Sequence, residues 1–94
     1  MVVSFNDRVT VSPEVLISEV GNESVLLNLR SERYFGLDEI GTRMWKAFTS
    51  AETIQAAYES LLDEYEVEPE LLRRDMSELI EKLLDQGLVE IAGE

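Results

Sequence analysis

The chain has 94 residues and a formal net charge of −12, from 20 acidic and 8 basic side chains. This length suits one domain with one core, and an apolar content of 45% supports a folded globule. The negative field repels nucleic-acid phosphates and anionic membranes, so the composition favours polypeptide partners. Cysteine and histidine are both absent, which removes thiolate chemistry and the commonest general base near neutral pH. We therefore expect no enzyme, no cofactor and no metal site.

No part of the sequence resembles a targeting or membrane segment. The start of the chain lacks the basic and apolar pattern of a signal peptide, and no apolar run approaches the roughly 20 residues that cross a bilayer. We therefore expect a cytoplasmic protein.

The first twelve residues, MVVSFNDRVTVS, have scattered apolar positions without a strong period. They predict a loose lead-in over residues 1–12, with at most a short strand at residues 9–11. One folded domain over residues 13–91 is expected to follow.

Three predicted strands come next. Residues 15–20 are rich in β-branched side chains, and Gly21 and Asn22 form the connection of a tight hairpin. The second strand has a period of two, in which Val25, Leu27 and Leu29 alternate with Leu26, Asn28 and Arg30. A polar turn, RSER, then leads to a short aromatic strand at residues 34–37. The order predicts an antiparallel three-stranded meander.

Three helices are predicted after the meander. Asp38 can cap the first helix, whose apolar positions are Ile40, Met44, Trp45 and Phe48. Thr49 and Glu52 match a capping box before a second amphipathic helix, with apolar positions from Ile54 to Tyr65. Pro69 is suited to the first turn of the third helix, and Gly87 to its end. A few extended residues at 89–91 close the chain.

Strands followed by helices with short connections predict an α+β fold, in which helices cover one face of a small antiparallel sheet. The helical part is expected to be winged helix-turn-helix-like. This architecture suits DNA binding as well as peptide binding, so the fold class alone does not decide between them.

The strand from Arg33 to Leu37 is the first candidate site. A short last strand of a small sheet is often an edge with unpaired N–H and C=O groups, and a glycine within it lets another backbone approach. Tyr34 and Phe35 point to opposite faces because strand side chains alternate. One ring can therefore enter the core while the other stays available, and the edge can receive a peptide. The alternative is an edge that only closes the domain's own sheet.

The last helix is the second candidate site. At about 100° per residue, one face gathers Leu72, Met76, Leu79, Ile80 and Leu83, with Leu71, Asp75 and Glu78 along its flank. This pattern is typical of a wide core stripe with solvated borders. Beside a free strand edge, the same strip would form the second wall of a groove, with Met76 as an adaptable contact.

Two other functions are disfavoured by the acidic residues. A DNA-binding helix at residues 68–86 would need basic side chains for the phosphates. It carries six acidic against three basic residues: Glu68, Glu70, Asp75, Glu78, Glu81 and Asp85 against Arg73, Arg74 and Lys82. The acidic run at residues 63–70 also lacks the glycine and ligand spacing of a calcium loop. It is typical of a solvated charge cluster.

Three segments of the chain carry a family resemblance: the stretch VLLNLRSERYFGLDEIGTRMW, residues 51–67, and residues 69–89 with DQGLVE near the end. Together they resemble the PqqD-like family of peptide-recognition proteins. The resemblance covers residues 13–91. Its most specific part is the Arg-Tyr-Phe-Gly-Leu-Asp element at residues 33–38 before a Gly-x-x-x-Trp helix at residues 41–45. It implies a winged-helix-like fold and recognition of the leader segment of ribosomally made, post-translationally modified peptides.

The resemblance also implies where the leader binds: as an extra strand on the third strand, in the cleft against the last helix. The implied contacts are Arg33, Tyr34, Phe35, Gly36 and Leu37 on the strand, and Leu71, Asp75, Met76 and Leu79 on the helix. Backbone pairing would give affinity, and pockets beside Tyr34 and between strand and helix would give sequence choice. It implies no catalytic residue.

Within the family, ERYFGLDEIG is most similar to the small stand-alone members of lasso-peptide pathways. These imply a papain-like or transglutaminase-like leader peptidase and an ATP-dependent macrocyclase as partners. The pyrroloquinoline quinone pathway member is the alternative, and it implies a radical S-adenosylmethionine enzyme. Because no enzyme domain is fused before Glu94, we expect the modifying enzyme to be a separate protein. The expected function is a non-catalytic adaptor; an acidic winged-helix regulator and an enzyme-stabilising subunit are the alternatives of another class.

Overall fold

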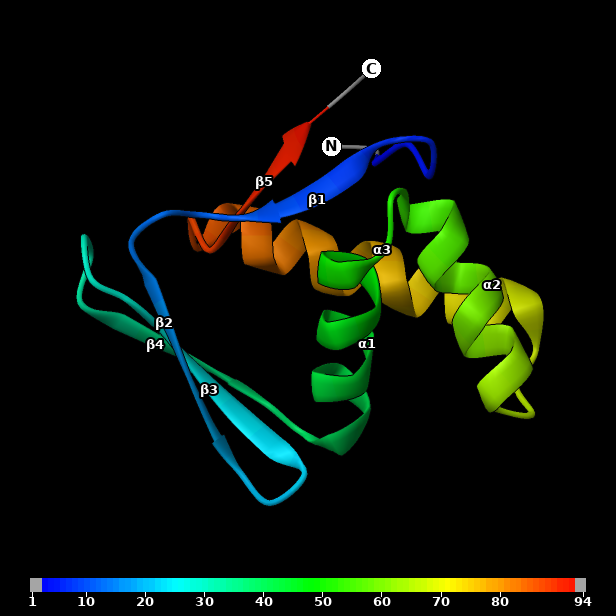
Figure 1. Cartoon of the computed structure of the whole chain (residues 1–94), viewed down its shortest axis with the longest axis horizontal. Helices are drawn as coiled ribbons and strands as arrows, with labels where there is room; N and C mark the ends of the chain where they lie inside the picture. The colour runs from blue at the N-terminus through cyan, green and yellow to red at the C-terminus, as the bar shows by residue number, and fades with distance from the viewer. Residues whose placement is uncertain (1–2, 93–94) are drawn as a thin grey trace.

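The computed structural model describes residues 3–92 and contains two antiparallel sheets and three helices (Figure 1). In chain order the elements are β1 (Arg8–Val11), β2 (Val15–Val20), β3 (Glu23–Asn28), β4 (Arg33–Leu37), α1 (Glu39–Ser50), α2 (Ile54–Glu64), α3 (Pro69–Asp85) and β5 (Val89–Ala92). Strands β2, β3 and β4 form the larger sheet, which extends to one side of the helices. The predicted α+β class, with a three-stranded antiparallel sheet followed by three helices, is confirmed.

The β2-β3-β4 meander forms where the alternating pattern predicts it. Gly21 has a φ of 63° in the turn between β2 and β3, a conformation that glycine adopts without steric cost. Directly paired residues share a face of the sheet. We call one face the outer face, because its side chains are mostly exposed; it carries Leu16, Ser18, Val20, Glu23, Val25, Leu27, Tyr34 and Gly36.

The opposite face of the sheet packs on the helices. In β3 this face carries Ser24, Leu26 and Asn28, which are 3%, 0% and 7% exposed. The Thr42 hydroxyl donates to Ser24 Oγ at 3.0 Å, and the Asn28 amide donates to the Gln86 carbonyl at 2.9 Å. Helix residues thus satisfy both buried polar side chains, which is what burial of a polar group requires. The alternating set of β3 that faces the core is therefore Ser24, Leu26 and Asn28, although two of its three members are polar.

Helix α1 begins at the predicted cap. Asp38 Oδ1 accepts the Gly41 N–H at 2.7 Å, and its backbone is extended, as a capping residue requires. Trp45 and Phe48 are 4% and 0% exposed and pack edge to face, with ring centroids 5.9 Å apart. Trp45 and Phe48, two of the predicted apolar positions of this helix, therefore belong to the core.

The capping box predicted at Thr49 and Glu52 is wrong. Helix α1 continues through Ser50, and the Thr49 hydroxyl donates to the Trp45 carbonyl at 2.6 Å within that helix. The residue that caps α2 is Thr53, whose extended backbone (φ −142°, ψ 161°) lets its Oγ1 accept the Ala56 N–H at 3.1 Å. A cap needs extended backbone, which Thr49 lacks because it is still helical.

Helices α2 and α3 bury the faces that their periodicity predicts. The buried residues are Ile54, Ala57, Tyr58 and Leu61 in α2, and Leu72, Met76, Ile80 and Leu83 in α3. Pro69 is the first residue of α3, and Gly87 follows it with a φ of 69°. Both predicted helix signals are confirmed.

The chain before residue 13 is not the loose lead-in that the sequence predicts. Strand β1 pairs antiparallel with β5, so that Val9 lies opposite Ile91. The carbonyls of Phe5 and Asp7 accept the first N–H groups of α2, from Gln55 at 2.8 Å and Ile54 at 2.9 Å. Residues 3–12 are therefore part of the fold; residues 1–2 lie outside the described range. The pairing links segments about 80 residues apart, which a local period cannot reveal.

Within residues 3–92, no helix is long and apolar enough to cross a bilayer. The same residues contain no group of acidic side chains arranged to hold a metal ion.

Candidate functional site

Strand β4 presents a free backbone edge, since in the described chain it pairs with β3 alone. The bond from the Leu29 N–H to the Glu14 carbonyl (2.9 Å) continues the β2–β3 register and fixes which groups point where. Odd-numbered residues of β3 bond to β2, and even-numbered ones bond to β4. By the same alternation, the N–H and C=O groups of Tyr34 and Gly36 point away from the sheet. The edge thus offers two donors and two acceptors to another strand.

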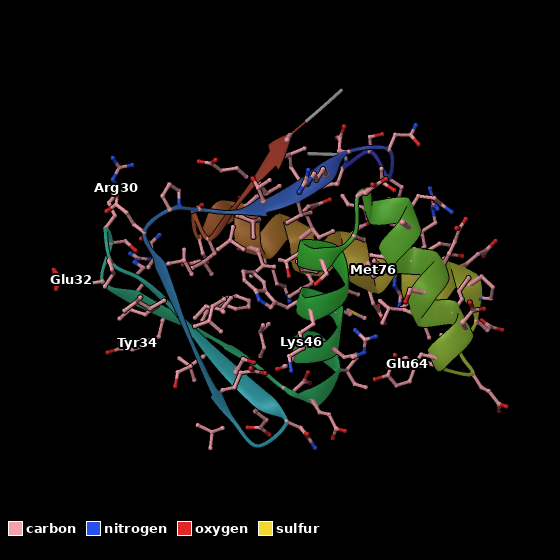
Figure 2. The ribbon with its side chains drawn as sticks, in the orientation of Figure 1. Arg30, Glu32, Tyr34, Lys46, Glu64 and Met76 are labelled. Atoms are coloured by element: carbon pink, nitrogen blue, oxygen red, sulfur yellow. The ribbon has the colours of Figure 1, made fainter. Side chains whose placement is uncertain are left out.

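The two aromatic rings of β4 lie on opposite faces of the sheet, as the alternation predicts. Tyr34 is 71% exposed on the outer face, and Phe35 is partly buried against the core on the other. Figure 2 shows the Tyr34 side chain at the sheet, away from the helices. Tyr34 is therefore the ring that remains available to a partner, while Phe35 helps to anchor the edge.

The other three predicted strand residues flank these rings. Arg33 is exposed, Leu37 is 5% exposed and belongs to the core, and Gly36 is exposed. A Cβ at Gly36 would have no atom within 4 Å. The backbone around Gly36 is thus open to a passing chain.

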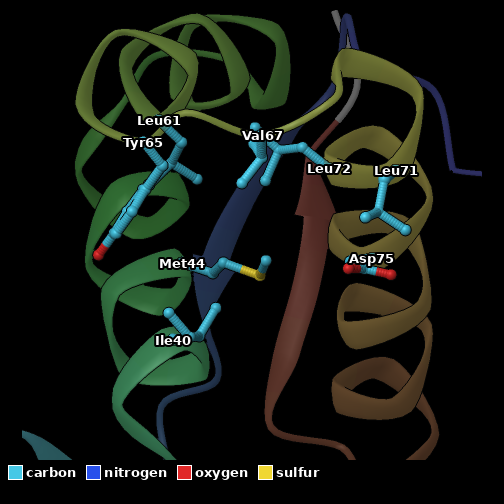
Figure 3. Close-up of a pocket in the computed structure, with 8 residues that line it drawn as sticks. All are labelled: Ile40, Met44, Leu61, Tyr65, Val67, Leu71, Leu72 and Asp75. Atoms are coloured by element: carbon cyan, nitrogen blue, oxygen red, sulfur yellow. The ribbon is translucent and has the colours of Figure 1, made fainter.

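An apolar cavity of about 90 Å³ lies between α1 and α3 (Figure 3). It is lined by Ile40, Met44, Leu61, Tyr65, Val67, Leu71, Leu72 and Asp75. In Figure 3, Ile40 and Met44 extend from α1 and face Leu71 and Asp75 on α3. Ile40 and Leu71 are 49% and 42% exposed, which is unusual for large apolar side chains facing each other. The cavity can therefore accept an apolar side chain from outside.

The four residues predicted on the last helix fall into two groups. Leu71 and Asp75 line the cavity. Met76 is 0% exposed and lies among the helices (Figure 2), whereas Leu79 is partly buried against the core. The helical period correctly predicted a stripe, but Met76 lies in its centre and has no exposed surface. The structure therefore groups Leu71 and Asp75 in one site and leaves Met76 beneath it.

Sequence reasoning did not identify the α1 side of this cavity, nor Val67 and Tyr65. Ile40 was taken as part of the buried stripe of α1, yet it lies in the first turn and remains exposed. Its place next to the predicted cap, one turn before the buried residues, is the signal that could have marked it. Ile40 follows Leu37 by three residues, so the start of α1 links the β4 edge to the cavity.

An ion pair beside the cavity joins α1 to the end of α2. Arg43 donates to both carboxylate oxygens of Glu64, with Nε–Oε2 and Nη2–Oε1 distances of 2.7 and 2.6 Å. These bonds lower the pKa of Glu64 and raise that of Arg43. Burial raises the pKa of the adjacent Tyr65, which lines the cavity. The bidentate geometry joins α1 to α2, which contributes Leu61 to the cavity lining.

Residues 23–89 match the model of the family described as coenzyme PQQ synthesis protein D (PqqD). The chain belongs to the PqqD family. The matched range includes both β4 and α3, and thus both parts of the candidate site. The family resemblance predicted from residues 33–38 is confirmed.

Two solved structures resemble this PqqD-family chain over nearly its whole length. One, described as TbiB1 in complex with the TbiA(beta) leader peptide, has a TM-score of 0.80 and 28% identity, covering 86% of this chain and 94% of that one. The other, described as lasso peptide synthetase B1 complexed with the leader peptide, has a TM-score of 0.76 and 25% identity, covering 90% and 98%. A comparison with curated protein sequences returns no match.

Proposed function

We propose that this protein is a non-catalytic adaptor that binds the leader of a ribosomally made precursor peptide and presents it to a modifying enzyme. The observation that carries the proposal is the free β4 edge, where the backbone groups of Tyr34 and Gly36 point outward. The start of α1, with Ile40 at the α1–α3 cavity, follows this strand directly. Both similar structures are described as complexes with leader peptides. The leader would lie on β4 as a fourth strand of the sheet.

Backbone pairing and side-chain pockets have separate parts in this proposal. The four outward groups of Tyr34 and Gly36 would bind any extended peptide, and thus contribute affinity without sequence choice. Sequence choice would come from alternate leader side chains, one set beside Tyr34 and the other beside Phe35 and the start of α1. Arg33 and Leu37 mark the two ends of the paired segment.

The α1–α3 cavity would hold an apolar leader side chain. Leu71 and Ile40 form its exposed walls, and Asp75 adds a carboxylate at the rim. Leu79 follows Asp75 by about one turn on α3 and would be the next leader contact along that helix, while Met76 is fully buried in the core. Removing exposed apolar surface from water stabilises such a contact by about 25 cal/mol per Å².

The outer face of the sheet would receive the enzyme that acts on the leader. Its exposed apolar side chains include Leu16, Val20 and Val25, at 55%, 73% and 39% exposure. A contiguous exposed apolar surface is typical of a protein interface. A leader strand on β4 extends this same face, so an enzyme docked there would contact adaptor and leader together.

The comparisons support two alternatives for the partner enzymes. The lasso synthetase neighbour favours a separate leader peptidase and macrocyclase. The family description favours, as the alternative, presentation of a precursor to a radical S-adenosylmethionine enzyme.

Titration with leader peptides from precursor genes adjacent to this one, followed by amide NMR shifts, tests the adaptor function. We expect the shifts to concentrate at residues 33–37, at Ile40 and along residues 71–79. A folded protein that binds none of the leaders, but binds the modifying enzyme, would instead favour the enzyme-stabilising subunit. Shifts confined to β2 would place the peptide on the wrong edge.

A further inference from the structure

The outer face of the sheet is hollowed over Gly36. The hollow has a volume of about 270 Å³ and is lined by Val20, Glu23, Ser24, Val25, Gly36, Leu37 and Asp38. Val25 lies directly opposite Gly36 in the register, and Val20 opposite Glu23. The hollow therefore begins at the free β4 edge and continues over β3 toward the end of β2.

The fold itself gives no reason for a glycine at position 36. Its φ is outside the left-handed region, and a Cβ would have no atom within 4 Å. Glycine weakens a strand interior, and it often marks a place where another chain passes closely. The bare backbone of Gly36 is thus explained by a partner that lies over it.

The chemistry of the hollow indicates what that partner brings. Its floor is apolar at Val20 and Val25, and its rim carries the carboxylates of Glu23 and Asp38. Within residues 3–92, the four ion pairs involve Glu14, Glu64, Glu19 and Asp75 and leave Glu23 and Asp38 without a cation. One Asp38 oxygen, Oδ1, accepts the Gly41 N–H at 2.7 Å. An apolar stem with a positive end complements both features.

We propose that the leader carries a lysine or arginine opposite Gly36, whose stem crosses the glycine onto Val25 and whose charge lies near Glu23 and Asp38. This inference rests on the proposed binding of the leader to β4. A residue paired with Gly36 points to the outer face, because paired residues share a face. The ring of Tyr34 borders it on one side, which directs the side chain over Gly36.

The dimensions of the sheet select a long side chain. Neighbouring strands lie about 4.8 Å apart, so a leader strand is about 5 Å from Gly36 and about 10 Å from Val25. A short side chain ends above Gly36. Lysine and arginine continue beyond it, toward the Glu23 side of the hollow.

A random peptide library displayed on phage and panned against the protein provides the test. We expect binders of the wild-type protein to share a lysine or arginine at one fixed position. Replacing that residue by methionine in a purified binder should weaken binding about tenfold, as loss of a charge-assisted contact does. Binders without a shared basic position would overturn the inference and leave leader capture standing.

Two variants link the preference to the hollow. Gly36→Leu fills the hollow, and Glu23→Lys reverses one rim charge; each should abolish the basic preference while an NMR amide spectrum remains that of a folded protein. Glu52→Lys, an equal charge change in the α1–α2 connection, should leave it intact. A preference that survives both Gly36→Leu and Glu23→Lys would overturn the inference. A library that yields no wild-type binder at all would overturn leader capture itself, and with it this inference.

Discussion

At the scale of single residues, the backbone of Tyr34 and its ring have separable tasks. The ring is exposed on the outer face, whereas the N–H points to the free edge and takes no part in the β3–β4 ladder. Proline lacks the N–H and is tolerated on edge strands. A proline at this position can therefore remove a donor to the partner without breaking a bond inside the sheet.

We expect Tyr34→Pro to bind a leader peptide about fivefold more weakly than Tyr34→Ala, because a net hydrogen bond contributes about 1 kcal/mol. Both variants lose the ring, so the difference reports the backbone bond alone. Isothermal titration calorimetry measures it, and Phe35→Pro, which removes a donor to β3, is the control that should unfold the edge. Equal affinities of Tyr34→Pro and Tyr34→Ala would argue against strand addition at this residue.

The turn between β3 and β4 depends on Asn28, a residue that the sequence pattern did not single out. The turn RSER was predicted from its polar residues, but the side chain that organises it is Asn28. Its Oδ1 accepts the Arg30 N–H at 2.9 Å, and its amide reaches the Gln86 carbonyl 58 residues away. An asparagine within an alternating strand does not by itself indicate a distant hydrogen-bond partner. Here the acceptor is a backbone carbonyl at the end of α3, which no side-chain pattern marks.

At the scale of elements, the framing of the cavity depends on how α1 and α2 are held. Arg43 and Glu64 are partly exposed, and their bidentate bond lowers the pKa of Glu64 below its ordinary 4.5. A carboxyl whose pKa falls on folding stabilises the fold above its unfolded pKa. That stabilisation is lost as the pH falls through the lower, folded value.

We therefore expect Glu64→Gln to be less stable than the wild-type protein at about pH 7, with the difference shrinking at about pH 3. Urea unfolding of both proteins at each pH gives this difference. Repulsion among the many other carboxylates changes with pH in both proteins and largely cancels in the comparison. Glu59→Gln, on the same helix without an ion pair in the described chain, is the control. A difference that does not change with pH would mean that the pair is not held in solution.

The cavity between the helices is a property of packing, and this is why only part of its α3 side was predicted. Helical spacing placed Leu71 and Asp75 beside the apolar stripe of α3, and the structure finds both at the cavity. Spacing gives the direction of a side chain but not its depth, so it left open whether Met76 lies in the core stripe or contacts a partner in the groove, and the structure places it in the core. Ile40 faces Leu71 only because α1 and α3 lie on opposite sides of the cavity (Figure 3).

Leu71→Asp should weaken leader binding about tenfold or more, because it places a second carboxylate in an apolar cavity next to Asp75. The side chain is 42% exposed, so the fold should tolerate the change. Fluorescence anisotropy with a labelled leader measures the affinity. Val11→Asp on β1, with a similar 37% exposure but outside the cavity, should bind normally. Similar losses in both variants would point to a general charge effect rather than to the cavity.

At the scale of the whole molecule, local signals predicted the meander, the helices and their order, because caps, turn glycines and periods lie within a few residues of each element. The closure of the chain was not predicted. Short extended segments were expected at residues 9–11 and 89–91, and they are confirmed as β1 and β5; what local patterns did not predict is that the two pair across nearly the whole sequence. The N-terminal segment was consequently assigned to a lead-in outside the domain.

The contacts of Phe5 show how that segment joins the helices. The ring is 7% exposed and packs edge to face with Tyr58 of α2, with centroids 5.8 Å apart. The guanidinium carbon of Arg73, on α3, lies 4.0 Å from the centroid of Phe5. One aromatic side chain from the start of the chain therefore bridges two helices, through burial and a cation–π contact.

Phe5→Ala should lower the free energy of unfolding by about 3 to 5 kcal/mol, the usual cost of removing a buried phenylalanine. Small domains are stable by only about 5 to 15 kcal/mol, so this loss would leave a larger fraction of the protein unfolded near the growth temperature. Chemical denaturation measures the change, and Asn6→Ala, at the exposed neighbouring position, should alter it little. If Phe5→Ala were as stable as Asn6→Ala, the segment before residue 13 would be a dispensable lead-in after all. The predicted loss instead makes the start of the chain part of the same cooperative unit as the helices that frame the candidate site.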